Sequence, residues 1–259
     1  MPNHVLYALY EMMKVSYIMN KAESGSLAKL EGHKFEHVVA EYLTENLNIP
    51  FETMGDSKTK VDVHDASMNI RLSVKNPSGK NTQVSLITQN NFIAAMGITD
   101  KVITGFIHDF FGGNHVSEYP RHRMAKSDID ADTNDAFVKY LNDNKSAIFD
   151  LIVSTGYNRR SNVNYMIFAR TKNVVDNIFA VNIADFKDYY MDGEWTQNET
   201  TFEFNVNGNK LFHLQMKGSG KKYTNSYHAM MFHIYGANII DKYVEDVAVL
   251  ESVLHDNKI

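Results

Sequence analysis

The segment GDSKTKVDVHDASMNIRLSVKN, residues 55 to 76, alternates apolar and polar side chains over two short runs. Alternation with a period of two is typical of a half-buried β-strand, because successive side chains point to opposite faces of a sheet. The two runs are separated by Ala66–Asn69, a polar stretch short enough to form the loop of a hairpin. The pattern therefore predicts an antiparallel hairpin over about residues 58 to 76, and it commits the chain to a fold that contains a sheet.

The expected hairpin gathers its charged and hydroxylic side chains on one face. The apolar residues share the other face: Val61, Val63, Ile70, Leu72 and Val74. Keeping like faces together across the loop sets the register, which places Asp62 opposite Ser73. Lys75 becomes the diagonal neighbour of Asp62 at roughly 7–8 Å, within reach of a long side chain. The pattern predicts a carboxylate, a hydroxyl and an ammonium at one spot; the alternative is an ordinary half-buried hairpin whose polar face meets water.

A helix is predicted upstream of the hairpin, over residues 26 to 47. Within LEGHKFEHVVAEYLTENL, Glu36 shares a helix face with three apolar residues: Ala40, Leu43 and Leu47. A carboxylate above an apolar stripe is costly to bury alone, so we expect it to be paired or to bind something. In the alternative interpretation, Glu36 merely flanks the stripe or pairs with Lys29 or His33.

Together the two segments carry a resemblance to a known family. A helix of the form Gly-x-x-Phe-Glu-x-x-Val-Ala-Glu-Tyr-Leu, here Gly32 to Leu43, is followed by Asp62 and by a hydrophobic strand that ends at Lys75. This order resembles the PD-(D/E)XK nuclease superfamily, which includes type II restriction endonucleases and Holliday-junction resolvases. The match covers about residues 30 to 76. It implies an α/β (α+β) fold with a restriction-endonuclease-like core, a mixed β-sheet flanked by helices.

The resemblance also implies a catalytic site made of Glu36, Asp62, Ser73 and Lys75. Asp62 is the expected principal ligand of Mg²⁺, for which Mn²⁺ could substitute, with help from Glu36 and the backbone carbonyl of Val74. Lys75 is expected to orient or help deprotonate the attacking water, and Ser73 to hold a metal-bound water. Phosphodiester hydrolysis needs an activated water and charge neutralisation, which a hard cation on carboxylate oxygens supplies.

Two positions depart from the family pattern. Val61 replaces the proline before the Asp, and Ser73 occupies the middle acidic position. Some restriction enzymes with serine there take an acid from a following helix, but at that place this chain offers Gln89. With two carboxylates, we expect weak metal binding until DNA phosphates complete the coordination shell.

The rest of the chain interleaves helical and strand patterns, which predicts an α/β or α+β class. The expected helices cover residues 3–20, 84–96 and 239–254, with a long one running from SDIDADTND to Ile152. The expected strands cover residues 163–169 and 227–235, with a hairpin of TFEFNV and LFHLQMK around Asn207-Gly208. No linker forces a boundary, so residues 1–259 are interpreted as one nuclease domain. Its catalytic core is expected over about 26–110, with DNA-recognition and dimerisation elements in about 111–259.

Two tempting motifs are rejected as sites. SDIDADTND spaces acids like a calcium loop, but Thr133 and Lys139 replace the Gly and the acid that such a loop requires. MKGSGKKYT has Gln215 where a phosphate loop has its first Gly. Basic loops could instead touch DNA phosphates, and weaker candidates lie near the hairpin. These candidates are Arg121, Arg123, Lys126, Arg159, Arg160, Lys217, Lys221 and Lys222, with Lys60, His64, Arg71 and Gln89 in the second tier.

Composition limits the remaining classes. The chain has no cysteine, which excludes disulfides, thiolate catalysis and cysteine-ligated metal sites and favours a reducing, cytoplasmic location. No stretch approaches the roughly 20 apolar residues of a membrane span, so no membrane partner is expected. The net charge of -5 argues against a non-specific nucleic-acid coat but permits a local basic cleft.

The expected function is therefore a Mg²⁺-dependent DNA endonuclease. The closest fit is a type II restriction enzyme that cuts specific sites in double-stranded DNA as a homodimer. A Holliday-junction or repair nuclease would use the same site on branched DNA. Ser73 and the absent third acid also permit a catalytically inactive DNA-binding relative of the fold.

Overall fold

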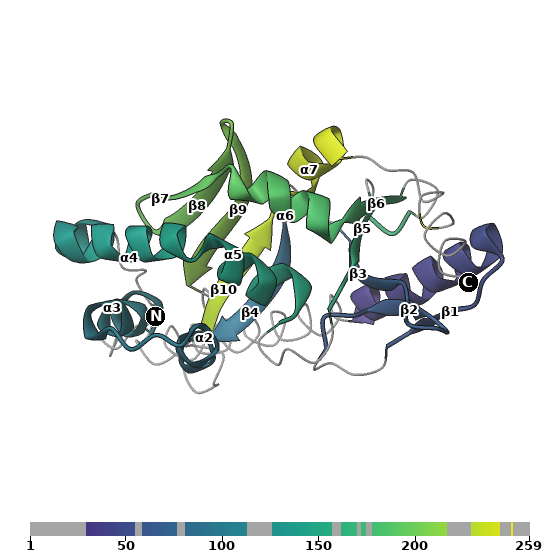
Figure 1. Ribbon diagram of the computed structural model, residues 1–259, viewed down its shortest axis with the longest axis horizontal. Helices are drawn as coiled ribbons and strands as arrows, with labels where there is room; N and C mark the ends of the chain where they lie inside the picture. The colour runs from purple at the N-terminus through teal and green to yellow at the C-terminus, as the bar shows by residue number, and fades with distance from the viewer. Residues whose placement is uncertain are drawn as a thin grey trace, which may run out of the picture.

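The computed structural model describes residues 30–54, 59–76, 81–112, 126–156, 162–169, 172–174, 178–216, 229–243 and 250. This part of the chain forms two five-stranded β-sheets with helices packed around them (Figure 1). The first sheet has the order β1 (Phe51–Thr53), β2 (Val63–Asp65), β3 (Arg71–Lys75), β5 (Tyr165–Ala169) and β6 (Ile178–Asn182). The second has the order β4 (Thr82–Thr88), β10 (Ala229–Ile234), β9 (Asn209–Met216), β8 (Thr201–Val206) and β7 (Glu194–Gln197).

The helices confirm a mixed α/β class. They are a helix of residues 30–47, α2 (Gln89–Met96), α3 (Lys101–Gly112), η1 (Lys126–Asp128), α4 (Ala131–Asp143), α5 (Lys145–Phe149), the π-helix η2 (Asp150–Ser154), α6 (Ile183–Met191) and α7 (Gly236–Tyr243). In Figure 1 the first sheet and the purple helix of residues 30–47 lie at one end of the molecule. The second sheet lies toward the other end, with α3 and α4. The first sheet is mixed, because β3 and β5 are parallel and its other pairs are antiparallel.

The β2–β3 hairpin has the predicted register. Val63 pairs with Leu72 and His64 pairs with Arg71, so the next step along the ladder places Asp62 opposite Ser73. The loop between the strands is Ala66–Asn69, as expected, and the Asp65 amide closes it by donating to the Ile70 carbonyl at 3.1 Å. The first strand is shorter than the sequence pattern suggested, because β2 begins only at Val63.

A buried carboxylate organises that loop. Asp65 is 1% exposed, and its side chain accepts the Ser67 amide at 3.0 Å and the Ile70 amide at 2.5 Å. The Ser67 hydroxyl donates to the same carboxylate. An Asp that satisfies loop amides in this way holds the turn and therefore the register of both strands.

Two hydrophobic clusters fix the first sheet from its two faces. One lies between the helix of residues 30–47 and the sheet, and includes Phe35, Val39 and Leu43 with Val63 and Leu72. The sequence pattern assigned Val61 to this face, which is wrong. Val61 lies before β2, outside the alternating strand, and packs in the other cluster.

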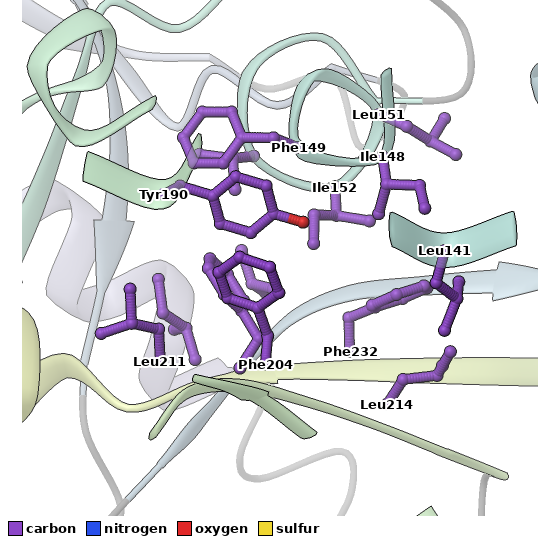
Figure 2. Close-up of a cluster of buried hydrophobic side chains, with 14 of the residues drawn as sticks. Leu141, Ile148, Phe149, Leu151, Ile152, Tyr190, Phe204, Leu211, Leu214 and Phe232 are labelled. Atoms are coloured by element: carbon purple, nitrogen blue, oxygen red, sulfur yellow. The ribbon is translucent and has the colours of Figure 1, made fainter. Parts of the chain in front are cut away.

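The second cluster joins elements of both sheets and is rich in aromatic rings. Figure 2 shows Phe149 and Tyr190 on its helical side, facing Phe204 and Phe232 on the strands. The rings of Tyr190 and Phe204 stack with centroids 4.0 Å apart. Trp195 is 1% exposed and donates its indole N–H to the Tyr190 hydroxyl at 3.1 Å.

The predicted helix over residues 84–96 is wrong in its first half. Residues up to Thr88 belong to β4, which pairs with β10, and only Gln89–Met96 are helical. Thr88 ends the strand and caps α2 by accepting the Asn91 amide at 3.3 Å. Val84 and Ile87 of the strand and Phe92 of the helix are buried in the same hydrophobic cluster.

The other elements follow the sequence prediction with changes at their ends. Asp130 caps α4 through the Thr133 amide at 2.8 Å, so the acidic stretch does begin a helix. The long helix expected after it is divided at Asn144 into α4, then α5 and η2. The β8–β9 hairpin, β5 and β10 are confirmed, and α7 begins at Gly236, earlier than expected. The predicted helix over residues 3–20 lies outside the described residues.

Within the described residues, no helix combines the length and apolar character needed to cross a membrane.

Replacing the loop carboxylate should loosen the whole hairpin. Asp65→Ala removes the acceptor for three donors in a buried place, and we expect it to lower the free energy of unfolding by about 2–4 kcal/mol. Urea unfolding followed by circular dichroism measures this. Asp143→Ala, at an exposed ion pair on α4, is the matched control and should change stability by less than about 0.5 kcal/mol. Equal stability of the two variants would show that Asp65 does not hold the loop.

Candidate active site

The hairpin brings Asp62, Ser73 and Lys75 into one hydrogen-bonded group. The Ser73 hydroxyl donates to Oδ2 of Asp62 at 3.1 Å, and the Lys75 ammonium donates to Oγ of Ser73 at 2.6 Å. Nζ of Lys75 and Oδ2 of Asp62 are 3.5 Å apart and form an ion pair. The predicted meeting of a carboxylate, a hydroxyl and an ammonium is therefore present.

The three side chains of this group differ in their exposure to water. Ser73 is 1% exposed, whereas the side chains of Lys75 and Asp62 are 13% and 24% exposed. Ser73 satisfies its hydroxyl in both directions, as donor to the acid and as acceptor from the amine. Water reaches part of the carboxylate and of the ammonium, while the buried serine is hydrogen-bonded to both.

A backbone amide that the sequence pattern did not reveal completes this arrangement. The Val74 N–H donates to Oδ2 of Asp62 at 2.7 Å. The Val74 carbonyl, expected as a metal ligand, accepts from the Lys75 ammonium at 3.2 Å. Backbone donors are set by the pairing of strands and not by residue type, so residue patterns cannot identify them.

Glu36 lies near this group on the helix of residues 30–47. Burial raises the pKa of the Glu36 carboxyl, and the negative charge of Asp62 raises that pKa further. His33, whose Nδ1 is 3.0 Å from Oε2 of Glu36, and the charge of Lys75 act in the opposite direction. Glu36 therefore has the His33 partner of the alternative interpretation, and it is also close enough to Asp62 for the two charges to interact.

The two carboxylates fit a hard divalent cation in part. Hydrogen bonds from the described residues reach Oδ2 of Asp62 and Oε2 of Glu36, which leaves Oδ1 and Oε1 for a cation. Carboxylate and carbonyl oxygens are ligands of Mg²⁺, which retains several waters. No cluster of three or more His, Asp or Glu suited to a metal occurs in the described ranges. Two carboxylates and one carbonyl would bind a divalent cation weakly unless further oxygen ligands complete its coordination shell.

Lys60 lies inside the protein next to this group. Its ammonium donates to the carbonyls of Val84 in β4 and Ile152 in η2, at 2.6 and 2.9 Å. Burial lowers the pKa of Lys60 to about 7, and the positive charge of Lys75 contributes to that lowering. With both carbonyls bound, Lys60 ties the segment before Asp62 to β4 and η2, a placement that favours a positioning role over a phosphate contact.

The remaining candidates near the hairpin have other partners. Gln89 is buried, and its Nε2 donates to the Ile107 carbonyl in α3 at 3.2 Å. Nδ1 of His64 donates to the Asp65 carbonyl at 2.9 Å. Lys126 is exposed in η1. The other basic candidates lie outside the described residues: Arg121, Arg123, Arg159, Arg160, Lys217, Lys221 and Lys222.

Comparison with known proteins gives a distant structural likeness. No protein-family model matches the chain, and no curated protein matches it. Among solved structures, the restriction endonuclease MspI in complex with its cognate DNA is similar at 11% sequence identity and a TM-score of 0.45. The likeness covers 76% of this chain and 77% of MspI. A likeness of this strength does not assign the chain to a family.

The lowered pKa of Lys60 predicts how stability depends on pH. An unfolded lysine keeps its proton up to about pH 10.4, whereas folded Lys60 releases its proton near 7. Between these values the unfolded state binds more protons, so stability rises with pH and is lost as the pH falls toward 7. Relative to Lys60→Met, the wild-type free energy of unfolding should rise by up to about 1.4 kcal/mol per pH unit over this range.

Urea unfolding of both proteins in EDTA at pH 7.5 and 9.0 measures that difference. Groups remote from Lys60 titrate equally in the two proteins and cancel when the curves are subtracted. Parallel stability profiles would mean that Lys60 keeps an ordinary pKa in the folded protein.

Proposed function

We propose that this protein is a divalent-metal-dependent endonuclease that hydrolyses phosphodiester bonds in DNA. The observation that carries the proposal is the group of Asp62, Ser73 and Lys75, joined by hydrogen bonds of 2.6 and 3.1 Å, with Glu36 electrostatically coupled to it. An acid just before β2 is paired with an amine at the end of β3, and both are partly exposed, which suits a reaction that needs a cation site and a positive group beside a phosphate.

Each side chain has a role that follows from its position. Asp62 and Glu36 would hold Mg²⁺ or Mn²⁺, through the carboxylate oxygens that the described residues leave unbound, with the Val74 carbonyl as a further ligand. A bound cation would supply charge neutralisation at the phosphate and activation of water. Lys75 would orient the attacking water and offset phosphate charge. Ser73 sets the spacing between the acid and the amine, or holds a metal-bound water.

The finer proposal is a type II restriction enzyme. The substrate would be double-stranded DNA, cut at specific sites by a homodimer in which each protomer supplies one such site. The net charge of -5 means that DNA contacts must be local and not spread over the whole surface. Arg121, Arg123, Arg159, Arg160, Lys217, Lys221 and Lys222 are the basic residues we propose for those contacts. The assignment of this class is an analogy, because a fold does not fix a function.

Cleavage of a fully sequenced plasmid tests the proposal. The protein should produce discrete fragments with Mg²⁺ or Mn²⁺ and none with EDTA. Lys75→Ala should lower the cleavage rate by at least about 100-fold, the usual contribution of a group that positions or moves a proton. DNA binding, measured by fluorescence anisotropy, should remain. Sequencing of the fragment ends gives the recognition site.

The matched control is Lys139→Ala, which removes an exposed lysine paired with Asp143 on α4 and should cleave like the wild type. An intact linear substrate together with a cut four-way junction would move the protein to the junction-resolving class. Intact DNA of both kinds, with binding unaffected by Asp62→Asn and Lys75→Ala, would contradict a nuclease and leave an inactive DNA-binding protein.

The homodimer proposal has its own test. Light scattering on the protein mixed with a cleavable duplex in Ca²⁺ or EDTA should give a mass of two 29.5 kDa chains per duplex. In cleavage, both strands should be cut in one binding event. A single chain per duplex and accumulation of nicked plasmid would contradict the dimer without affecting the catalytic site.

A further inference from the structure

A cavity of about 760 Å³ lies beside the first sheet, away from the Asp62 carboxylate. It is bounded by the first residues of β3 and β5, the end of β6, the start of α6, the α5–η2 segment and the end of α2. Its volume falls within the roughly 300–1,000 Å³ of pockets that bind small molecules. Nothing in the catalytic proposal uses this space.

Arg71 is the residue that links this cavity to the active site. Arg71 lies two residues before Ser73 and four residues before Lys75 on β3. Because side chains alternate between the two faces of a strand, all three leave the same face. Along a strand, Arg71 is about 13 Å from Lys75. Asn164 fixes the Arg71 backbone, because its Oδ1 accepts the Arg71 amide at 2.7 Å and its own amide donates to the Arg71 carbonyl at 3.0 Å.

The Arg71 side chain lacks an acceptor that it should have. Its Nε is buried, and no described residue lies within hydrogen-bonding distance of it. A buried N–H without a partner is destabilising, more so on a charged group. Guanidinium groups bind oxyanions with two parallel hydrogen bonds, and Arg71 lines the cavity without a side-chain hydrogen bond to any described residue, so an anion in the cavity would give its terminal nitrogens an acceptor.

The charges around the cavity point to one anionic group. Apart from Arg71, the described charged residues in its lining are Lys187 and Asp150. These two neutralise each other, because the Lys187 ammonium contacts both Asp150 oxygens at 2.8 and 2.7 Å. The lining therefore has one unpaired cation, which matches a ligand with a single phosphate or similar group.

The rest of the lining suits a planar, hydrogen-bonding body next to that group. Asn182 uses Oδ1 to cap α6, at 2.8 Å from the Ala184 amide, and among the described residues its Nδ2 has no acceptor. Asn162 also lines the cavity, as do the apolar residues Met96 and Leu151. Amides that read acceptor and donor edges, beside apolar side chains that contact a ring, are what a nucleobase needs.

We propose that this cavity is a nucleotide-binding subsite in which Arg71 binds the phosphate and the amide and apolar residues hold the base. The nucleotide could belong to the DNA strand that is cut, two or so residues along β3 from the catalytic group, or it could be a free mononucleotide. The first source rests on the proposed function; the second does not. The shared chemistry is a single nucleoside phosphate.

Isothermal titration of the full-length protein with dAMP, dGMP, dCMP and dTMP tests the site. At least one should bind about tenfold or more tightly than inorganic phosphate and than its own nucleoside. Arg71→Gln should weaken this binding at least about tenfold, the loss expected for a hydrogen-bonded charged pair. Lys139→Gln is the control and should bind like the wild type. Absence of nucleotide binding, or equal binding by wild type and Arg71→Gln, overturns the proposal.

A thermal midpoint and a second variant distinguish loss of binding from loss of folding. Because Nε of Arg71 has no acceptor, Arg71→Gln should have a thermal midpoint no lower than the wild type, and only the wild type should be stabilised by the nucleotide. Ala147→Phe, at an exposed position of α5 on the cavity wall, leaves Arg71 intact and should also weaken binding. Full nucleotide affinity in Ala147→Phe would place the ligand elsewhere and overturn the cavity assignment.

DNA measurements distinguish the two sources. If the subsite takes a nucleotide of the cut strand, the mononucleotide should compete with cleavage, and Arg71→Gln should raise KM more than it lowers kcat. If the source is a free nucleotide, saturating mononucleotide should leave the cleavage rate of the wild type unchanged. A wild-type protein that binds nucleotides but cuts no DNA would reject the proposed function and leave the subsite standing.

Discussion

The candidate site depends on one carboxylate oxygen that accepts hydrogen bonds from several donors. Oδ2 of Asp62 receives the Ser73 hydroxyl and the Val74 amide, and lies 3.5 Å from the Lys75 ammonium. All three donors come from β3, so one strand holds the acid of the segment before β2 by side chain and backbone together. Charge-assisted hydrogen bonds of this kind are stronger than neutral ones, and those from the described residues all reach Oδ2, not Oδ1. The geometry of the site is therefore a consequence of how two strands pair.

Two packing layers hold that pair in place. On one face, the apolar stripe of the helix of residues 30–47 packs on Val63 and Leu72, and this packing brings Glu36 toward the end of the sheet where Asp62 lies. On the other face, the aromatic cluster joins both sheets. Lys60, which precedes β2, donates hydrogen bonds to β4 of the second sheet and to η2. A mutation in either layer can therefore change the spacing of the charged groups without touching them.

The local parts of this arrangement follow from the sequence, and the nonlocal parts do not. Alternation and loop length suffice to place Asp62 opposite Ser73, because a strand has a strict period of two and a one-residue slip would bury the charged face. The apolar stripe of the helix likewise places Glu36, because residues three and four positions apart lie on the same face of a helix. In contrast, residues 84–88 form a strand because β10, more than 140 positions later, supplies hydrogen-bonding partners. The internal role of Lys60 and the Arg71 cavity depend on such distant contacts, and no local pattern encodes them.

Mn²⁺ binding shows whether Asp62 and Glu36 hold one cation together, as we propose. Electron paramagnetic resonance measures free Mn²⁺ in the presence of an uncleavable duplex, for the wild type, Asp62→Asn, Glu36→Gln and the double variant. If the two acids share one ion, each single change should weaken binding by about tenfold or more, and the double change should add little to the larger single effect. Wild-type affinity in both single variants would contradict a cation site at these acids, and strictly additive losses would place the two acids at separate sites.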